Sequence, residues 1–198
     1  MDGERDGSER EVVITSDMRF PSLLPNMDRA AAAAPAGDNA PHDQGGMGTC
    51  VVYALVTVVA QRLMFKYNKA LDETQAHSVI IHEAGAHAGS ATVDVVDAVN
   101  RAGETLKLQT TGSVEAMQLR ISHEPVSNDF GALCAHMRDS DGEDAQAVVY
   151  ISTEAGGHAR HAVAAEGVVT SAAGDKTVRC KNSWGPDIPY FDVVPDGE

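Results

Sequence analysis

One apolar run constrains the fold more than any other feature of this 198-residue chain. It extends from Cys50 to about Lys66, contains neither glycine nor proline, and follows the glycine-rich stretch QGGMGTC. Because such a run favours a helix, and Thr49 is a suitable N-cap, we predict a helix that begins at Cys50. Its residues are apolar nearly all round, so the helix is expected to be central and buried.

Shorter predicted elements follow in a definite order. Helical patterns begin near Leu71 and cover Thr92 to Arg101 and Asn128 to Met137. Segments 147–152, 161–169 and 177–183 are short and rich in β-branched residues, which predicts strands, and 11–15 is a further short candidate. Helices that precede strands indicate an α+β fold.

Composition excludes several classes of partner. The chain has 15 basic and 29 acidic residues, and its net charge of −14 disfavours binding to nucleic acid or anionic membranes. No apolar run approaches the ~18 residues of a membrane span. The acidic start MDGERDGSERE is the reverse of a secretory signal, so we expect an intracellular, cytoplasmic protein, with secretion possible only if a leader was removed.

Three cysteines cannot form a disulfide framework and suit a reducing compartment. Cys134 and Cys180 are expected to pack in the core, Cys180 from an alternating strand. Cys50 differs because the first turn of a helix presents unpaired N–H groups that stabilise an anion such as a thiolate. A nearby histidine could then accept its proton. Taken alone, Cys50 could equally be a small buried core residue.

Three segments together resemble the papain-like cysteine peptidases. Gln44 to Cys50 resembles the family pattern QGxCGSCWAFA, in which a glutamine stands six residues before the nucleophile. His161 begins HAV, with Gly167 following, and resembles HAVxxxGY. Residues 181–185 read KNSWG, as in the family. The resemblance covers roughly residues 17 to 194, and its three motifs occur in the family order.

This resemblance implies a role for each site residue. Cys50 would be the nucleophile, His161 the base, and Asn182 the group that orients the imidazole. The Gln44 amide and the Cys50 backbone N–H would form the oxyanion hole. Trp184 would shield the His161–Asn182 hydrogen bond, and Gly48 and Gly89 would lie beside the substrate, Gly89 within a loop that resembles the family's GCxGG segment.

The resemblance also implies a two-lobe fold. We expect residues 1–16 to form an acidic flexible tail, 17–110 a helical lobe that carries Gln44 and Cys50, and 111–198 a β-rich lobe that carries His161 and Asn182. The second lobe would be an antiparallel, β-barrel-like unit.

The chain departs from the family at several positions. Met47 stands where a disulfide cysteine would precede the nucleophile, and Val51 replaces the usual tryptophan after it. The segment between Ile151 and His161 is short, and we expect no inhibitory pro-segment. These departures leave the substrate cleft and its specificity open.

Three other sets of residues can be considered for the site and are less favoured. His158 precedes the HAV pattern by three residues and could be mistaken for the base. His77, His82, Glu83 and His87 suggest zinc, but HExxxH has one residue too many for the metalloprotease motif, so a surface cluster is preferred. Asp94 and Asp97 are expected on a solvated helix face. We therefore expect neither a metal nor another cofactor.

The leading function is hydrolysis of peptide or amide bonds by a Cys-His-Asn triad through an acyl-enzyme. Its substrate would be a peptide or a small amide or ester. A non-proteolytic acyltransferase or amide-forming enzyme on the same triad is the first alternative. A catalytically silent binding protein is the second, and the presence of all five motif residues argues against it.

Overall fold

The structure is a computed structural model that describes residues 10–20, 23–26, 48–67, 69–84, 92–102, 106–110, 113–116, 119–125, 129–139, 147–152, 160–187 and 189–195. Gln44, Gly89, His87 and His158 lie outside these residues, as do Met47 and the short segment before His161.

Four helices occur in the described part of the chain, and each lies where the sequence predicts one. They are α1 (Cys50–Tyr67), α2 (Glu73–Ala84), α3 (Thr92–Ala102) and α4 (Phe130–Asp139). Aspartate caps explain two of the starts. Asp72 Oδ1 accepts from the Gln75 N–H at 2.9 Å before α2, and Asp129 Oδ1 accepts from the Ala132 N–H at 2.7 Å before α4.

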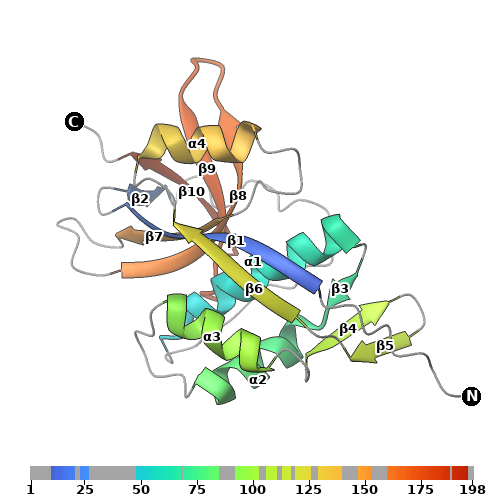
Figure 1. The fold of residues 1–198 in the computed structure, drawn as a ribbon. Coiled ribbons are helices and arrows are strands. Elements are labelled where there is room, and N and C mark those ends of the chain that lie inside the picture. The colour runs from blue at the N-terminus through green and yellow to red at the C-terminus, as the bar shows by residue number, and fades with distance from the viewer. Residues whose placement is uncertain are drawn as a thin grey trace, which may run out of the picture.

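The described strands form two sheets (Figure 1). The larger has the order β2-β10-β9-β8-β7-β1-β6, and the smaller has the order β3-β4-β5. The strands of the larger sheet are β1 (Arg10–Phe20), β2 (Leu23–Asn26), β6 (Leu119–Pro125), β7 (Ala147–Ser152), β8 (Arg160–Thr170), β9 (Lys176–Lys181) and β10 (Tyr190–Pro195). Those of the smaller are β3 (Ala70–Leu71), β4 (Lys107–Thr110) and β5 (Ser113–Ala116).

Helices and strands confirm the α+β class, and pairing within the larger sheet is mixed. β7 to β10 pair antiparallel as neighbours, and β2 pairs antiparallel with β10. β1 instead lies between β6 and β7 and pairs with both in parallel. Among the described strands no pairing joins β2 to β6. The barrel-like form of the second lobe, and the two lobes themselves, therefore stay predictions.

Apolar residues cover both faces of the larger sheet. On one face, α1, α2 and α3 pack against a core that includes Val148 of β7 and Ala162 and Ala164 of β8. On the other side of the sheet lies α4 (Figure 1). Its residues Leu133, Cys134 and Met137 pack with side chains of the opposite parity from the same strands. Alternating side chains of one strand point to opposite faces, so a helix layer can bury each face.

The helix α1 is buried along most of its length, as its apolar pattern predicts. Val52, Leu55, Val56, Val58 and Leu63 are almost fully inaccessible. Within the described residues no helix is both long enough and apolar enough to cross a membrane.

Two sequence predictions need correction. Residues 10–16, assigned to a flexible tail, belong to β1, which contains the candidate strand 11–15 and pairs in parallel with two neighbours. The Thr49 side chain does not cap α1, because its hydroxyl oxygen Oγ1 is buried without a hydrogen-bond partner among the described residues. The Thr49 backbone carbonyl instead accepts from the N–H groups of Val52 at 3.0 Å and Tyr53 at 3.3 Å.

Candidate functional site

Cys50 lies at the very start of α1. The residue is partly buried and packs against the core shared by α1 and the sheet. Gly48, two residues earlier, has a φ of 64°, a left-handed conformation that glycine adopts without steric cost. The thiol thus belongs to the first turn of α1, at the positive end of the helix dipole.

His161 and Asn182 make a direct hydrogen bond. His161 Nε2 lies 2.7 Å from Asn182 Oδ1, and both residues are buried. Because an amide oxygen only accepts, Nε2 carries the hydrogen, and Nδ1 of the neutral ring keeps the lone pair. The Asn182 backbone N–H donates to the Pro189 carbonyl at 2.8 Å, which fixes the chain at this point. The hydrogen bond to Asn182 therefore fixes both the tautomer and the orientation of the His161 ring.

Trp184 covers this pair. Its ring stacks on the His161 ring with a centroid separation of 4.4 Å and an interplanar angle of 21°. It also contacts Phe191 of β10, at 6.1 Å between centroids. Gly185 follows with a φ of 88°, so the chain can turn sharply after Trp184. Trp184 is 36% exposed, so one part of its ring faces solvent while another shields the imidazole.

The first turns of α1 lie against the start of β8 and the end of β9. Tyr53 and Ala54, one turn after Cys50, line a small cavity whose other wall includes Ala162 and Asn182. Ala162 directly follows His161 in the chain. The fold therefore brings the cysteine end of α1 and the His161–Asn182 pair to the same region, although more than a hundred residues separate them in sequence.

Burial favours the neutral form of His161. Desolvation lowers the pKa of His161 below its ordinary value, and the hydrogen bond to Asn182 partly offsets this. A neutral imidazole with a lone pair on Nδ1 can accept a proton, which is what a general base requires.

The other two cysteines occupy core positions, as predicted. Cys134 and Cys180 are both buried, and Cys180 is 0% exposed. Burial, together with the nearby carboxylates of Glu166 and Asp192, raises the pKa of the Cys180 thiol well above its ordinary value. Its S–H donates to the Val178 carbonyl at 3.7 Å. A reactive thiolate at either position is therefore disfavoured.

The residues considered for zinc divide between core and surface. His77 is buried and its ring lies 4.1 Å from that of Tyr53, which corrects the expectation that it belongs to a surface cluster. His82 and Glu83 are exposed. Asp94 and Asp97 are exposed on α3, as predicted.

Sequence reasoning missed a group of charged residues beside the site. Lys181 precedes Asn182 and lines the same cavity. Its ammonium lies 3.9 Å from Glu73 Oε2, and the charge of Glu166 also acts on it. Lys181 belongs to the KNSWG segment, but nothing in the local sequence indicates its partners, which come from α2 and β8.

Comparison with known proteins finds similarity to solved structures, and none to family models or curated proteins. Among solved structures, the chain is similar to the 2.05 Å crystal structure of the Amb a 11 cysteine protease, a ragweed pollen allergen, in its proform. The TM-score is 0.47 and the sequence identity 16%, and the match covers 90% of this chain and 61% of that one. This chain thus spans less than two thirds of the length of that protein.

Proposed function

We propose that the protein is a thiol-dependent hydrolase of peptide or amide bonds, built as a two-lobe papain-like enzyme. One observation carries the proposal: the buried His161–Asn182 hydrogen bond, covered by Trp184, lies beside the first turns of the helix that begins at Cys50. A cysteine, a histidine and an amide that orients the histidine are the parts that nucleophilic thiol catalysis needs.

In the acylation step, His161 Nδ1 takes the Cys50 proton and Sγ attacks the substrate carbonyl carbon. The carbonyl π electrons move to oxygen, and the Cys50 N–H and the Gln44 amide would stabilise this oxyanion. Each such donor contributes roughly 3 kcal/mol. When the tetrahedral intermediate collapses, the C–N bond breaks and the imidazolium gives its proton to the leaving amine.

In the deacylation step, neutral His161 takes a proton from water and the hydroxide oxygen attacks the thioester carbon. The C–S bond then breaks, and the sulfur recovers the proton from the imidazolium. Asn182 accepts from Nε2–H throughout, so Nδ1 faces the reaction in both steps. If an amine replaces water, the same intermediate yields a new amide, which is the acyl-transfer alternative.

Labelling with a thiol-alkylating epoxide tests the nucleophile. We expect modification of Cys50, because Cys134 and Cys180 are buried and the Cys180 thiol is disfavoured as an anion. Peptide mapping by mass spectrometry reads the modified positions. Equal labelling of all three cysteines in the folded protein would contradict an activated Cys50.

Cleavage of a mixed peptide library tests the reaction. We expect the wild type to release new termini, and Cys50→Ala to release none while melting close to the wild-type temperature. A matched Cys134→Ala variant should retain cleavage per folded molecule. New amide products formed with added amines, without hydrolysis, would favour acyl transfer instead.

A further inference from the structure

Lys181 carries a charge buried between the sheet and the helices. It is the last residue of β9, and its side chain is only 2% exposed. The Nζ atom lies 3.9 Å from Glu73 Oε2 and makes no hydrogen bond within the described part of the chain. A buried ammonium without hydrogen bonds is costly, and an apolar residue of similar volume is often at least as stabilising. The charge at this position therefore requires an explanation other than stability.

The surroundings of Lys181 are charged on several sides. Glu73 comes from the first turn of α2, and Glu166 of β8 accepts a hydrogen bond from Gln61 Nε2 of α1. Arg179 of β9 and Tyr190 of β10 complete the group. Burial lowers the pKa of Lys181, whereas the two carboxylates raise it. Burial also raises the pKa of Glu166 and brings that of Tyr190 to about 12.

This charged group adjoins the candidate site. A single peptide bond joins Lys181 to Asn182, and both residues line the cavity that Tyr53 of α1 closes from the other side. The ion pair connects the start of α2 to the end of β9, two segments far apart in sequence. Any movement of the Lys181 end of β9 relative to α2 would displace Asn182 with it.

We propose that Lys181 is a positioning residue: its ion pair with Glu73 holds Asn182 in hydrogen-bond contact with His161 and so keeps the neutral imidazole protonated on Nε2. The proposal rests on the proposed function, because only a base at Nδ1 needs this tautomer. Glu73 is the second residue of this pair, and it acts on Lys181 from the first turn of α2.

NMR of isotopically labelled histidine side-chain nitrogens reads the tautomer directly. The Cys50→Ala protein is the reference, so that no thiolate perturbs His161. We expect the reference to show a single tautomer with the proton on Nε2. Lys181→Met and Glu73→Gln should each move His161 toward a mixture of tautomers, and the double variant should move it no further than either single change. Lys176→Met, an exposed lysine at the other end of β9, should leave it unchanged.

The direction of the His161 titration separates positioning from a through-space charge effect. Loss of a nearby positive charge alone would raise the pKa of His161, and loss of a negative charge alone would lower it. If the two single variants shift the titration in opposite directions and keep the tautomer, Lys181 acts only through its charge and the proposal is overturned.

A conservative variant keeps the test possible if Lys181→Met misfolds. If Lys181→Met does not fold, Lys181→Arg and Glu73→Gln carry the test, since Arg retains the charge and should retain the tautomer. Glu73 is 17% exposed and its replacement should be tolerated. An unchanged tautomer in folded Glu73→Gln would also overturn the proposal.

Turnover supplies an independent readout in proteins that retain Cys50. Lys181→Met and Glu73→Gln should cleave about tenfold or more slowly, because a small misplacement of a catalytic group costs up to ~10²-fold. If no cleavage occurs even in the wild type, the proposed function fails, whereas the tautomer experiment still decides whether Lys181 positions His161.

Discussion

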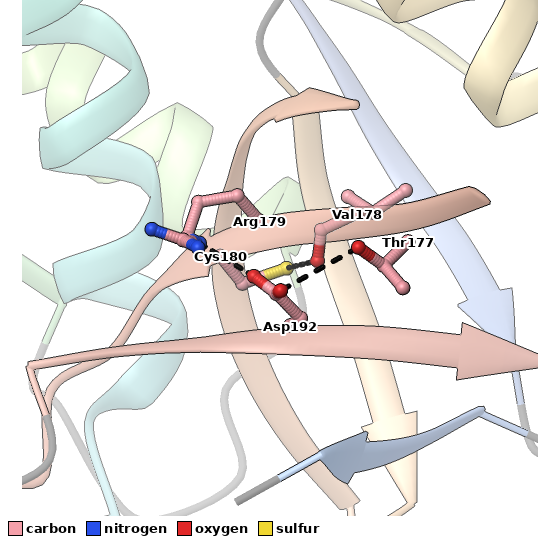
Figure 2. A network of polar contacts seen from close by, with 5 residues as sticks. All are labelled: Thr177, Val178, Arg179, Cys180 and Asp192. Carbon is pink, nitrogen blue, oxygen red and sulfur yellow. Dashed lines mark hydrogen bonds and ion pairs between the residues drawn. The ribbon is translucent and has the colours of Figure 1, made fainter. Parts of the chain in front are cut away.

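The strand β9 carries two cation–carboxylate pairs, and they differ in almost every respect. Arg179 Nε lies 2.5 Å from Asp192 Oδ1, and Thr177 Oγ1 donates to the same carboxylate at 3.5 Å (Figure 2). Two residues further along, Lys181 Nζ stands 3.9 Å from its partner Glu73 without a hydrogen bond to any described residue.

The first pair is local and the second is not. Arg179 and Asp192 face each other in the register of neighbouring strands β9 and β10, so the sheet itself assembles them. Glu73 reaches Lys181 from a helix in a different part of the chain. A complete local pair is what a stable sheet requires, whereas an incomplete distant pair beside Asn182 is what a functional site tolerates. The comparison therefore separates a residue that supports the fold from one that supports the site.

The largest effect is expected from Asp192→Ala. Asp192 is 1% exposed, and its loss leaves Arg179 and Thr177 without their carboxylate. We expect a loss of about 3 kcal/mol in the free energy of unfolding, measured by urea denaturation. Cleavage per folded molecule should be unchanged, and Asp187→Ala, at an exposed turn, should match the wild type. A stable Asp192→Ala protein with impaired cleavage would reverse the roles of the two pairs.

Asn182→Ala should have the opposite profile. Removal of the Asn182 amide frees Nε2 of His161, so the imidazole can rotate and change tautomer. We expect cleavage to fall by about a hundredfold. Denaturation should show a loss of about 1–3 kcal/mol, because the buried Nε2–H of His161 is left without its acceptor. A loss of stability without a matching loss of turnover would place Asn182 with the structural residues.

The stability of the protein should depend on pH through His161. Because burial lowers the folded-state pKa below the unfolded value of 6.5, the unfolded chain binds more protons in this window. The contribution of His161 to stability is thus present above pH 6.5 and is lost as the pH falls through the folded pKa. Urea midpoints from about pH 8 to about pH 5 should fall further in Cys50→Ala than in Cys50→Ala/His161→Gln.

The difference between those two proteins isolates His161, since Glu166 acts in both. The pKa of Glu166 is raised by burial, so its contribution is present at low pH and is lost as the pH rises. Identical pH profiles for the two proteins would mean that His161 is not desolvated in the folded state.

The smallest effect is expected from Thr49→Val, a change at the residue that precedes Cys50. Thr49 Oγ1 is buried without a partner among the described residues, like Lys181 Nζ. An isosteric apolar side chain should therefore stabilise the protein by about 1 kcal/mol. Thermal or urea denaturation would measure this gain. A loss of stability would indicate that the hydroxyl does cap α1 in solution.

Local patterns predicted the helices better than the sheet. The start of α1 at Cys50 and the span of β7 agree with the sequence prediction, because apolar runs and turn residues act over a few positions. The candidate strand 11–15 lies within β1, although the predicted tail extended to residue 16. The sequence did not predict β2, β6 and β10, or the three strands of the smaller sheet. Parallel neighbours such as β1 and β6 are distant in the chain, so no local pattern announces their pairing.

The sequence by itself determined which chemical groups are available, their order, and the alternation that buries Cys180. It also carried the two motifs that contain His161 of β8 and Asn182, which directly follows the neighbouring strand β9. Only the tertiary structure decided that His77 is buried, that Glu73 faces Lys181, and that the first turns of α1 lie beside Asn182. These contacts depend on how distant segments pack, and local periodicity contains no information about that packing.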